Sequence, residues 1–117
     1  MKTEGHLDKA RAFEERARHW DSDRDAPSVI EGIFNAAVHY IACGINQKHG
    51  QDIDSHAAQK RFLRDSDEDK VLDAFEALEN IRIASVYGGA WNGDRISRAL
   101  VLLEVIKKWT GTGRRPD

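Results

Sequence analysis

The sequence predicts an all-α protein, an up-and-down bundle of four long helices and one short helix. Apolar residues recur at three- and four-residue steps along most of the chain, a spacing that places them on one face of a helix. No segment shows the alternation of apolar and polar residues that marks a half-buried strand, and no internal repeat is present. Mostly short polar segments separate the helical ones, which is typical of a helical bundle.

The first two helices are expected to differ in burial. The first, over residues 5–22, has an apolar face and a charged face, and the segment "DSDRDAP" ends it. Pro27 suits the first turn of a second helix, where a missing N–H costs little. This helix, "SVIEGIFNAAVHYIACGI", is the most apolar segment, so we expect it at the centre of the bundle. Gly44 is its expected end.

Two polar segments introduce the third and fourth helices. After the polar loop "NQKHGQDID", Asp54 or Ser55 can cap a short helix, "SHAAQKRFLRD". The acidic segment "DSDEDK" then favours the start of a fourth helix through the helix dipole. The residues expected to face the core from these two helices are Ala58, Phe62, Leu63, Val71, Leu72, Phe75, Leu78 and Ile81.

The last helix is expected over residues 94–109, after the turn "GGAWNG". Its expected core residues are Ile96, Leu100, Leu103, Val105 and Ile106. The three tryptophans fall near helix ends, where they are expected to close the bundle: Trp20, Trp91 and Trp109. Residues 1–110 would then form one helical domain and residues 111–117 a flexible C-terminal tail.

The composition limits the functional classes. The chain has 117 residues, enough for one domain with a modest core. Its 32% charged and 40% hydrophobic residues are typical of a soluble, helix-rich protein. A net charge of −2 and a pI near 6.2 provide no overall attraction to nucleic acid or to an anionic membrane. Any contact with a nucleotide or with RNA would therefore have to come from a local patch.

The sequence also predicts a cytoplasmic location. A single cysteine, Cys43, excludes an intrachain disulfide and fits a reducing compartment. The first residues lack the apolar segment of a signal peptide. No apolar run approaches the roughly 20 residues that cross a bilayer, so we expect no membrane contact.

Four landmarks follow one another in an order that resembles a known superfamily. They are "KARAFEERA", "FNAAVHYIACGI", "DSHAAQKRFL" and a fourth helix that ends in Arg-x4-Tyr-Gly. Over residues 6–109 this order resembles the HEPN domain superfamily, the "higher eukaryotes and prokaryotes nucleotide-binding" domain. The resemblance implies an up-and-down bundle of four or more helices, in agreement with the apolar pattern.

The resemblance also implies partners and an activity. Many HEPN members are ribonucleases or toxins that dimerise, so that two Arg-x4–6-His motifs face a shared cleft. Others are inactive, bind nucleotides, or pair with a small nucleotidyltransferase. For this chain it implies a homodimer formed by the helices near Arg82 and a nucleotidyltransferase as a second candidate partner.

The ribonuclease motif itself is absent. Arg82 can take the place of the motif's arginine, but Tyr87 stands at the position of its histidine. None of the five histidines follows an arginine with four to six residues between them. A tyrosine with an ordinary pKa near 10 is a poor base at neutral pH, so we expect no catalytic residue here. Tyr87 can instead hydrogen-bond or stack on a ligand, and a surface arginine beside a packed tyrosine remains an equal alternative.

A second candidate patch surrounds the third helix. Lys48 and His49 precede it and His56 lies near its start, where cations and backbone amides together can hold a phosphate. The segment "KHGQDIDSH" lacks the spacing of a P-loop, and a solvated loop is the alternative. His39 and Cys43, four residues apart, are interpreted as core side chains, because two ligands do not make a zinc site. We expect neither a metal nor a cofactor.

Three functions remain open. The first is a non-catalytic nucleotide-binding or nucleotidyltransferase-partner module of the toxin–antitoxin type. The second is a HEPN ribonuclease toxin with a degenerate motif and a histidine recruited from elsewhere, His56 being the best placed. The third is a helical interaction module without nucleotide chemistry. The residues expected to line a cleft or bind a nucleotide are Arg82, Tyr87, His56, Lys48 and His49.

Overall fold

The computed structural model describes residues 3–18, 26–85 and 92–111. Every regular element in these residues is a helix, which confirms the all-α class and the expected four long helices and one short helix. In chain order the helices are α1 (Thr3–Arg18), α2 (Ala26–His49), α3 (His56–Asp65), α4 (Asp69–Ser85) and α5 (Asn92–Thr110). Trp20, Tyr87, Trp91 and all of the expected C-terminal tail (111–117) except Gly111 lie outside the described residues.

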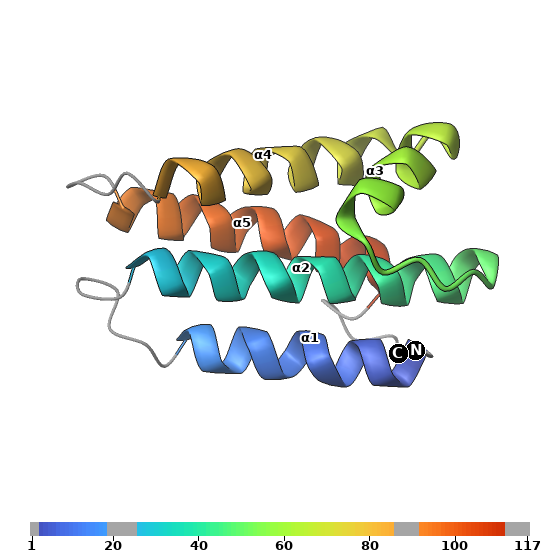
Figure 1. Cartoon of the computed structure of the whole chain (residues 1–117), viewed down its shortest axis with the longest axis horizontal. Coiled ribbons are helices and arrows are strands. Elements are labelled where there is room, and N and C mark those ends of the chain that lie inside the picture. The colour runs from blue at the N-terminus through green and yellow to red at the C-terminus, as the bar shows by residue number, and fades with distance from the viewer. Residues whose placement is uncertain (1–2, 19–25, 86–91, 112–117) are drawn as a thin grey trace.

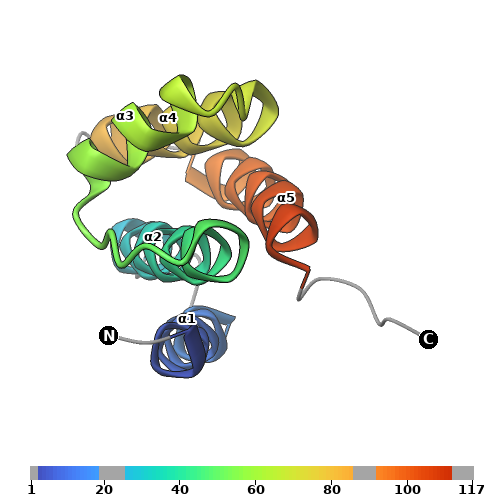
Figure 2. The same ribbon diagram turned by 90° about the vertical axis from the view of Figure 1, so that its right-hand side faces the viewer.

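The long helices form an up-and-down bundle around α2 (Figures 1 and 2). Helices α1 and α4 run opposite to α2, and α5 runs in the same direction as α2. Helix α1 lies at the edge and packs mainly on α2, whereas α4 and α5 pack on α2 and on each other. The short α3 lies beside α4, at the end of a loop that returns along α2 from its C-terminal end.

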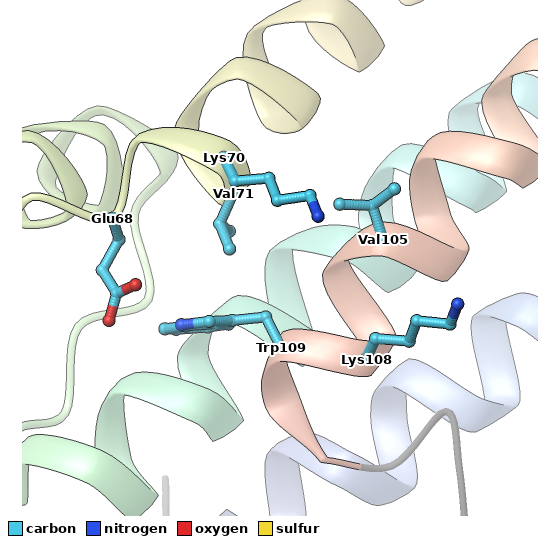
Figure 3. Close-up of a pocket in the computed structure, with 6 residues that line it drawn as sticks. All are labelled: Glu68, Lys70, Val71, Val105, Lys108 and Trp109. Carbon is cyan, nitrogen blue, oxygen red and sulfur yellow. The ribbon is translucent and has the colours of Figure 1, made fainter.

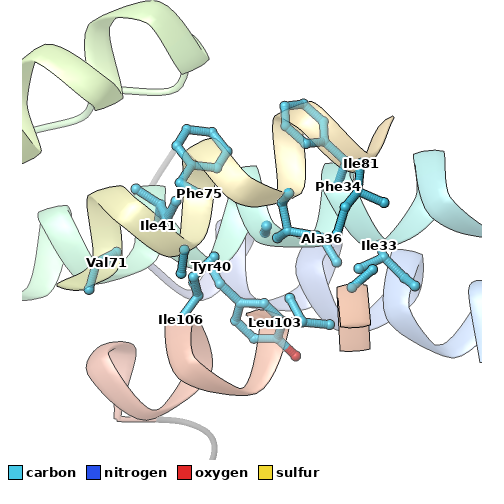
Figure 4. Packing of buried hydrophobic residues seen from close by; sticks show 14 of the residues in the cluster. Ile33, Phe34, Ala36, Tyr40, Ile41, Val71, Phe75, Ile81, Leu103 and Ile106 are labelled. Carbon is cyan, nitrogen blue, oxygen red and sulfur yellow. The ribbon is translucent and has the colours of Figure 1, made fainter. Parts of the chain in front are cut away.

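Helix α2 is the central helix, as its apolar sequence predicts. Its side chains from Val29 to Ile45 are buried at all but a few positions. Large apolar side chains of α4 and α5 meet those of α2 in one core (Figure 4). The buried residues include five core positions expected of α4, namely Val71, Leu72, Phe75, Leu78 and Ile81, and three of those expected of α5, namely Ile96, Leu103 and Ile106. Val86, which the same apolar spacing also favours as a core position, lies outside the described residues.

The length of α2 corrects one expectation about membranes. The segment Pro27–His49 is long and apolar enough to span a bilayer by length and composition, so the sequence does contain such a run. In the structure 67% of its most apolar window is buried inside the bundle. This burial is what the core helix of a soluble globular protein shows, and the compact bundle is consistent with that class.

A second correction concerns the end of α2. Gly44 does not end the helix, which continues to His49, and Gly50 with a φ of 71° follows it. Asn46, Lys48 and His49 are therefore helical and do not belong to a loop. Glycine is required at position 44 for a different reason, because a Cβ there would lie only 2.3 Å from Cζ3 of Trp109. The glycine lets the indole ring lie directly against α2.

The capping residue of α3 can also be assigned. Ser55 has an extended backbone, and its Oγ accepts a hydrogen bond from the Ala58 N–H at 3.3 Å. Of the two expected capping residues, Ser55 is the N-cap and Asp54 is not. Leu63 is buried as expected and Phe62 packs against the core, but Gln59 is fully buried as well, which its polarity did not predict.

A polar network joins the edge helix α1 to the rest of the bundle. The Tyr40 hydroxyl donates a hydrogen bond of 2.7 Å to the Glu14 carboxylate, and Lys107 Nζ lies 3.1 Å from the same carboxylate. Burial and this hydrogen bond raise the pKa of Tyr40 well above its ordinary value. The network connects α1, α2 and α5 through side chains that are almost fully removed from water.

Candidate functional site

Arg82 lies on α4 and is held against the start of α2. Its guanidinium lies 4.5 Å from the centre of the Phe34 ring, a cation–π distance. Its Nη1 lies 3.4 Å from a carboxylate oxygen of Glu31, which is half exposed and therefore a weak partner. Arg82 Nε is buried and has no acceptor among the described residues. Phe34 and Glu31 thus position the head group at the edge of the bundle.

The structure brings His56 to the same aromatic ring. His56 is exposed at the first position of α3, and its ring contacts Phe34 edge-on with centroids 5.7 Å apart. Phe34 is itself almost fully buried and stacks on Phe75. Arg82 and His56, which are 26 residues apart in sequence, therefore share one contact residue. Tyr87 lies outside the described residues, so the Arg82–Tyr87 pair stays a prediction.

Lys48 and His49 lie at the other end of α2. Fourteen residues separate Phe34 from Lys48, which corresponds to about 21 Å along a helix. The His49 ring contacts Phe62 edge-on at 4.8 Å, and Lys48 Nζ lies 5.4 Å from the centre of the Trp109 ring. Of the residues expected to form a cleft or phosphate site, the four that the structure describes therefore lie in two separate pairs, Arg82 with His56 and Lys48 with His49.

An open pocket of about 380 Å³ lies at the Lys48 end, between the start of α4 and the end of α5 (Figure 3). Its volume is within the range, roughly 300–1,000 Å³, of sites for small ligands. The lining residues are Glu68, Lys70, Val71, Val105, Lys108 and Trp109. The sequence contains one signal for this pocket, a tryptophan next to lysines in the last turn of a helix. Its position near a helix end predicts only that Trp109 closes the bundle, and does not predict that it lines a pocket.

The pocket combines an aromatic surface with positive charge. One side of the Trp109 ring faces Gly44, and its Nε1 is buried without an acceptor among the described residues. Packing, and not a hydrogen bond to the described residues, therefore sets the position of the ring. Lys70 of α4 and Lys108 of α5 line the pocket, and Lys48 of α2 lies beside the Trp109 ring. Glu68 is the one carboxylate among the lining residues.

A histidine cluster that the sequence did not predict lies on the α1 side of α2. His6 is fully buried, and its Nδ1 lies 3.2 Å from Nδ1 of His39. Its Nε2 lies 3.1 Å from Oδ1 of Asp52. Asp54 follows in the same loop, and one ligand atom each from His6, Asp52 and Asp54 lie within 4.8 Å of one another. His39, expected to be a core side chain, is only half-buried and pairs with another histidine.

Electrostatics and one buried amide shape this cluster. Burial lowers the pKa of His39 below its ordinary value of 6.5, the nearby His6 and Lys9 lower it further, and Asp54 opposes them. The loop is fixed by Gln59, whose Nε2 donates hydrogen bonds of 3.0 Å to backbone carbonyls of α2 and of the loop. No spacing rule could reveal the cluster, because its members are 33 and 46 residues apart.

Cys43 does not join His39 in a site. The thiol is buried and free, and burial raises its pKa, so it remains protonated and weakly reactive.

Comparisons with protein-family models, with curated proteins and with solved structures found no match to this chain. The resemblance to the HEPN superfamily therefore stays a prediction, and the functional argument depends on the sites themselves.

Proposed function

We propose that this protein is a non-catalytic nucleotide-binding helical module and that the nucleotide binds in the pocket at Trp109. One observation carries the proposal: an aromatic ring, two valines and two lysines, Lys70 and Lys108, line a pocket of about 380 Å³, and a third lysine, Lys48, lies 5.4 Å from the centre of the same aromatic ring. The chain has a net charge of −2, so this local cluster supplies the positive patch that a phosphate ligand requires.

Each part of a nucleotide has a partner in this pocket. The base can pack on the exposed side of Trp109 and on Val71 and Val105, and stacking on an aromatic ring contributes about 1–3 kcal/mol per base. The lysine ammonium groups attract the phosphates as point charges. Glu68 can accept a hydrogen bond from a ribose hydroxyl or from an exocyclic amine.

Isothermal titration calorimetry with AMP, ADP and ATP tests this proposal. We expect affinity to increase with phosphate number and to fall as salt is raised, because the lysines act through charge. Lys108→Ala and Lys70→Ala should each weaken ATP binding, whereas Lys9→Ala, an exposed lysine on α1, should not. Absence of binding, or an equal loss in the Lys9→Ala control, would contradict the assignment of the pocket.

The same proposal includes the expected partners. A homodimer, or a complex with a small nucleotidyltransferase in a toxin–antitoxin-type module in the cytoplasm, would need an exposed contact surface near Arg82. Ile83, next to Arg82 on α4, is 52% exposed and could contribute an apolar contact to such a surface, and Val101 on α5 is 64% exposed. We expect light scattering to show a dimer that Ile83→Glu dissociates. A wild-type monomer at micromolar concentration would remove the dimer from the proposal.

A degenerate HEPN ribonuclease is the second candidate function, and the shared contact on Phe34 favours it. Metal-independent RNA cleavage needs a group that moves the 2′-hydroxyl proton and a cation that stabilises the phosphate. His56 and Arg82 supply these two group types, and both contact the ring of Phe34. RNA cleavage lost in both His56→Ala and Arg82→Ala, but kept in His49→Ala, would support this function. No cleavage by the wild-type protein would exclude it.

A further inference from the structure

The histidine cluster next to α1 provides the ligand types of a transition-metal site. An imidazole nitrogen and two carboxylates converge there, His6 Nε2 with Asp52 and Asp54. The imidazole side of the cluster is dry, because the His6 side chain is only 1% exposed. The carboxylate side is open to water, since Asp52 is 47% exposed and Asp54 is exposed as well. An ion can therefore enter from solvent and meet a nitrogen ligand that is already fixed.

We propose that His6, Asp52 and Asp54 bind a divalent transition-metal ion of the Zn²⁺ class, with His39 as a positioning residue. This site is separate from the nucleotide pocket and does not depend on the proposed function. The ligand set favours this class of ion, because imidazole suits Zn²⁺, Fe²⁺ and Ni²⁺, whereas Mg²⁺ and Ca²⁺ prefer oxygen ligands alone. Three protein ligands leave one tetrahedral position for water.

The distances fit such an ion after a small movement. Zinc lies about 2.0–2.2 Å from nitrogen and oxygen ligands, so two ligands of one ion lie no more than about 4.4 Å apart. His6 Nε2 and Asp52 Oδ1 are 3.1 Å apart, within this limit. The three ligand atoms as a set lie within 4.8 Å, slightly beyond it. Because Asp54 is exposed, rotation of its side chain can close the remaining gap.

His39 gives the imidazole of His6 its orientation. Metal-bound histidines usually donate their other ring N–H to a fixed acceptor, which sets the tautomer. In the metal-free protein the 3.1 Å hydrogen bond to Asp52 needs the proton on His6 Nε2. Metal binding requires the other tautomer, in which His6 Nδ1–H donates to Nδ1 of His39, 3.2 Å away, and the lone pair of Nε2 is left for the metal. His39 is in turn held by stacking on Phe13, with ring centroids 5.7 Å apart and an angle of 11° between the rings.

The bound ion would join two parts of the fold that are distant in sequence. His6 belongs to the edge helix α1, and both aspartates belong to the loop that returns along α2. A metal bond between them would fix the start of α1 to this loop. Because the ion binds only when these segments are folded together, Zn²⁺ should raise the melting temperature of the whole chain.

Titration of the purified full-length chain with ZnCl₂ tests the proposal by calorimetry and by thermal melting. The wild-type protein should bind one Zn²⁺ per chain and melt at a higher temperature with it. Asp52→Asn and Asp54→Asn should each weaken binding about tenfold or more. Both residues are exposed, so these variants should fold, which circular dichroism checks. Asp73→Asn on α4 and His49→Gln, two exposed positions elsewhere, serve as controls that should keep wild-type affinity.

The role of His39 has its own readout. His39→Phe keeps an aromatic ring against Phe13 but removes the acceptor, and it should weaken Zn²⁺ binding and change the visible absorption of the Co²⁺-loaded protein. His39→Gln restores an acceptor and should recover part of the affinity. Equal Zn²⁺ affinity in the wild type and in an Asp52→Asn/Asp54→Asn double variant would overturn the site. Unchanged affinity and Co²⁺ spectrum in His39→Phe would overturn the positioning role.

Discussion

Substituting Gly44 with alanine tests whether the position of Trp109 depends on contact with α2. Inside an unobstructed helix, a glycine-to-alanine change stabilises a protein by about 1 kcal/mol. At Gly44 the added Cβ would lie 2.3, 2.8 and 2.9 Å from three atoms of the Trp109 ring. Carbon atoms pack best at about 3.5–4.0 Å, so the ring would have to move by about 1 Å or more.

This displacement should reverse the sign of the usual effect. Overpacking a core typically costs about 1–3 kcal/mol, which exceeds the gain in helix propensity. We therefore expect Gly44→Ala to lower the free energy of unfolding by about 1 kcal/mol, measured by urea denaturation. It should also weaken ATP binding, because the displaced ring lines the pocket.

A double-mutant cycle isolates the contact. In a Trp109→Ala background the obstruction is gone, so Gly44→Ala should stabilise that variant by about 1 kcal/mol. Stabilisation by Gly44→Ala in the wild-type background as well would refute the packing argument. The position of the indole would then have to be set by something other than α2.

Three further results are expected. Glu14→Gln removes one of the two carboxylates beside the mostly buried Lys107, the other being Glu104, and urea denaturation should show a loss of about 1–2 kcal/mol. An unchanged midpoint would mean that water screens the Glu14–Lys107 pair. The folded state lowers the pKa of His39, so the unfolded chain binds a proton at this residue more readily. In EDTA-containing buffer the free energy of unfolding should therefore be highest above about pH 6.5 and should fall as the pH is lowered below that value. His39→Phe should flatten this profile, and an identical profile would show that other groups cause it. Cys43 should resist a thiol reagent in the folded protein and react in denaturant, because its thiol is buried and has a raised pKa; fast modification of the folded chain would contradict this burial.

The helical bundle could be predicted from the sequence because its main signal is local. The apolar spacing of α4 alone specifies five of the seven side chains that the structure buries on this helix, and Ser55 stands where a helix N-cap is expected. Gly44 shows where local rules fail. A glycine near the end of an apolar run resembles a helix stop. This position instead requires glycine because the ring of Trp109, on another helix and 65 residues further along the chain, packs directly against it.

The candidate sites could be predicted only in part, because each combines segments that are distant in sequence. Arg82 and His56 were singled out by residue type, but their common contact with Phe34 depends on how α3 returns to α2. The partnership of His6 with Asp52 depends on a loop whose path is fixed by one buried glutamine. The residue types in a sequence indicate which chemistry is possible. Which of those side chains come into contact is decided by how the helices and the loop pack in the folded bundle.

The polar contacts of α1 have a structural consequence beyond the sites they form. Apolar side chains on an edge helix give affinity for α2 but tolerate sliding, because the hydrophobic effect has no direction. Hydrogen bonds do not tolerate such sliding, because they depend on short distances between particular atoms. His6 near the start of α1 and Glu14 in its second half hold partners at 3.1–3.2 Å and 2.7 Å, so a shift of one helical turn, about 5.4 Å, would break both sets. Burying these groups costs desolvation energy, and what they supply in return is a single register of α1 on α2. The same register places His6 against the Asp52 loop, so a metal bound there would strengthen an alignment that the apoprotein already has.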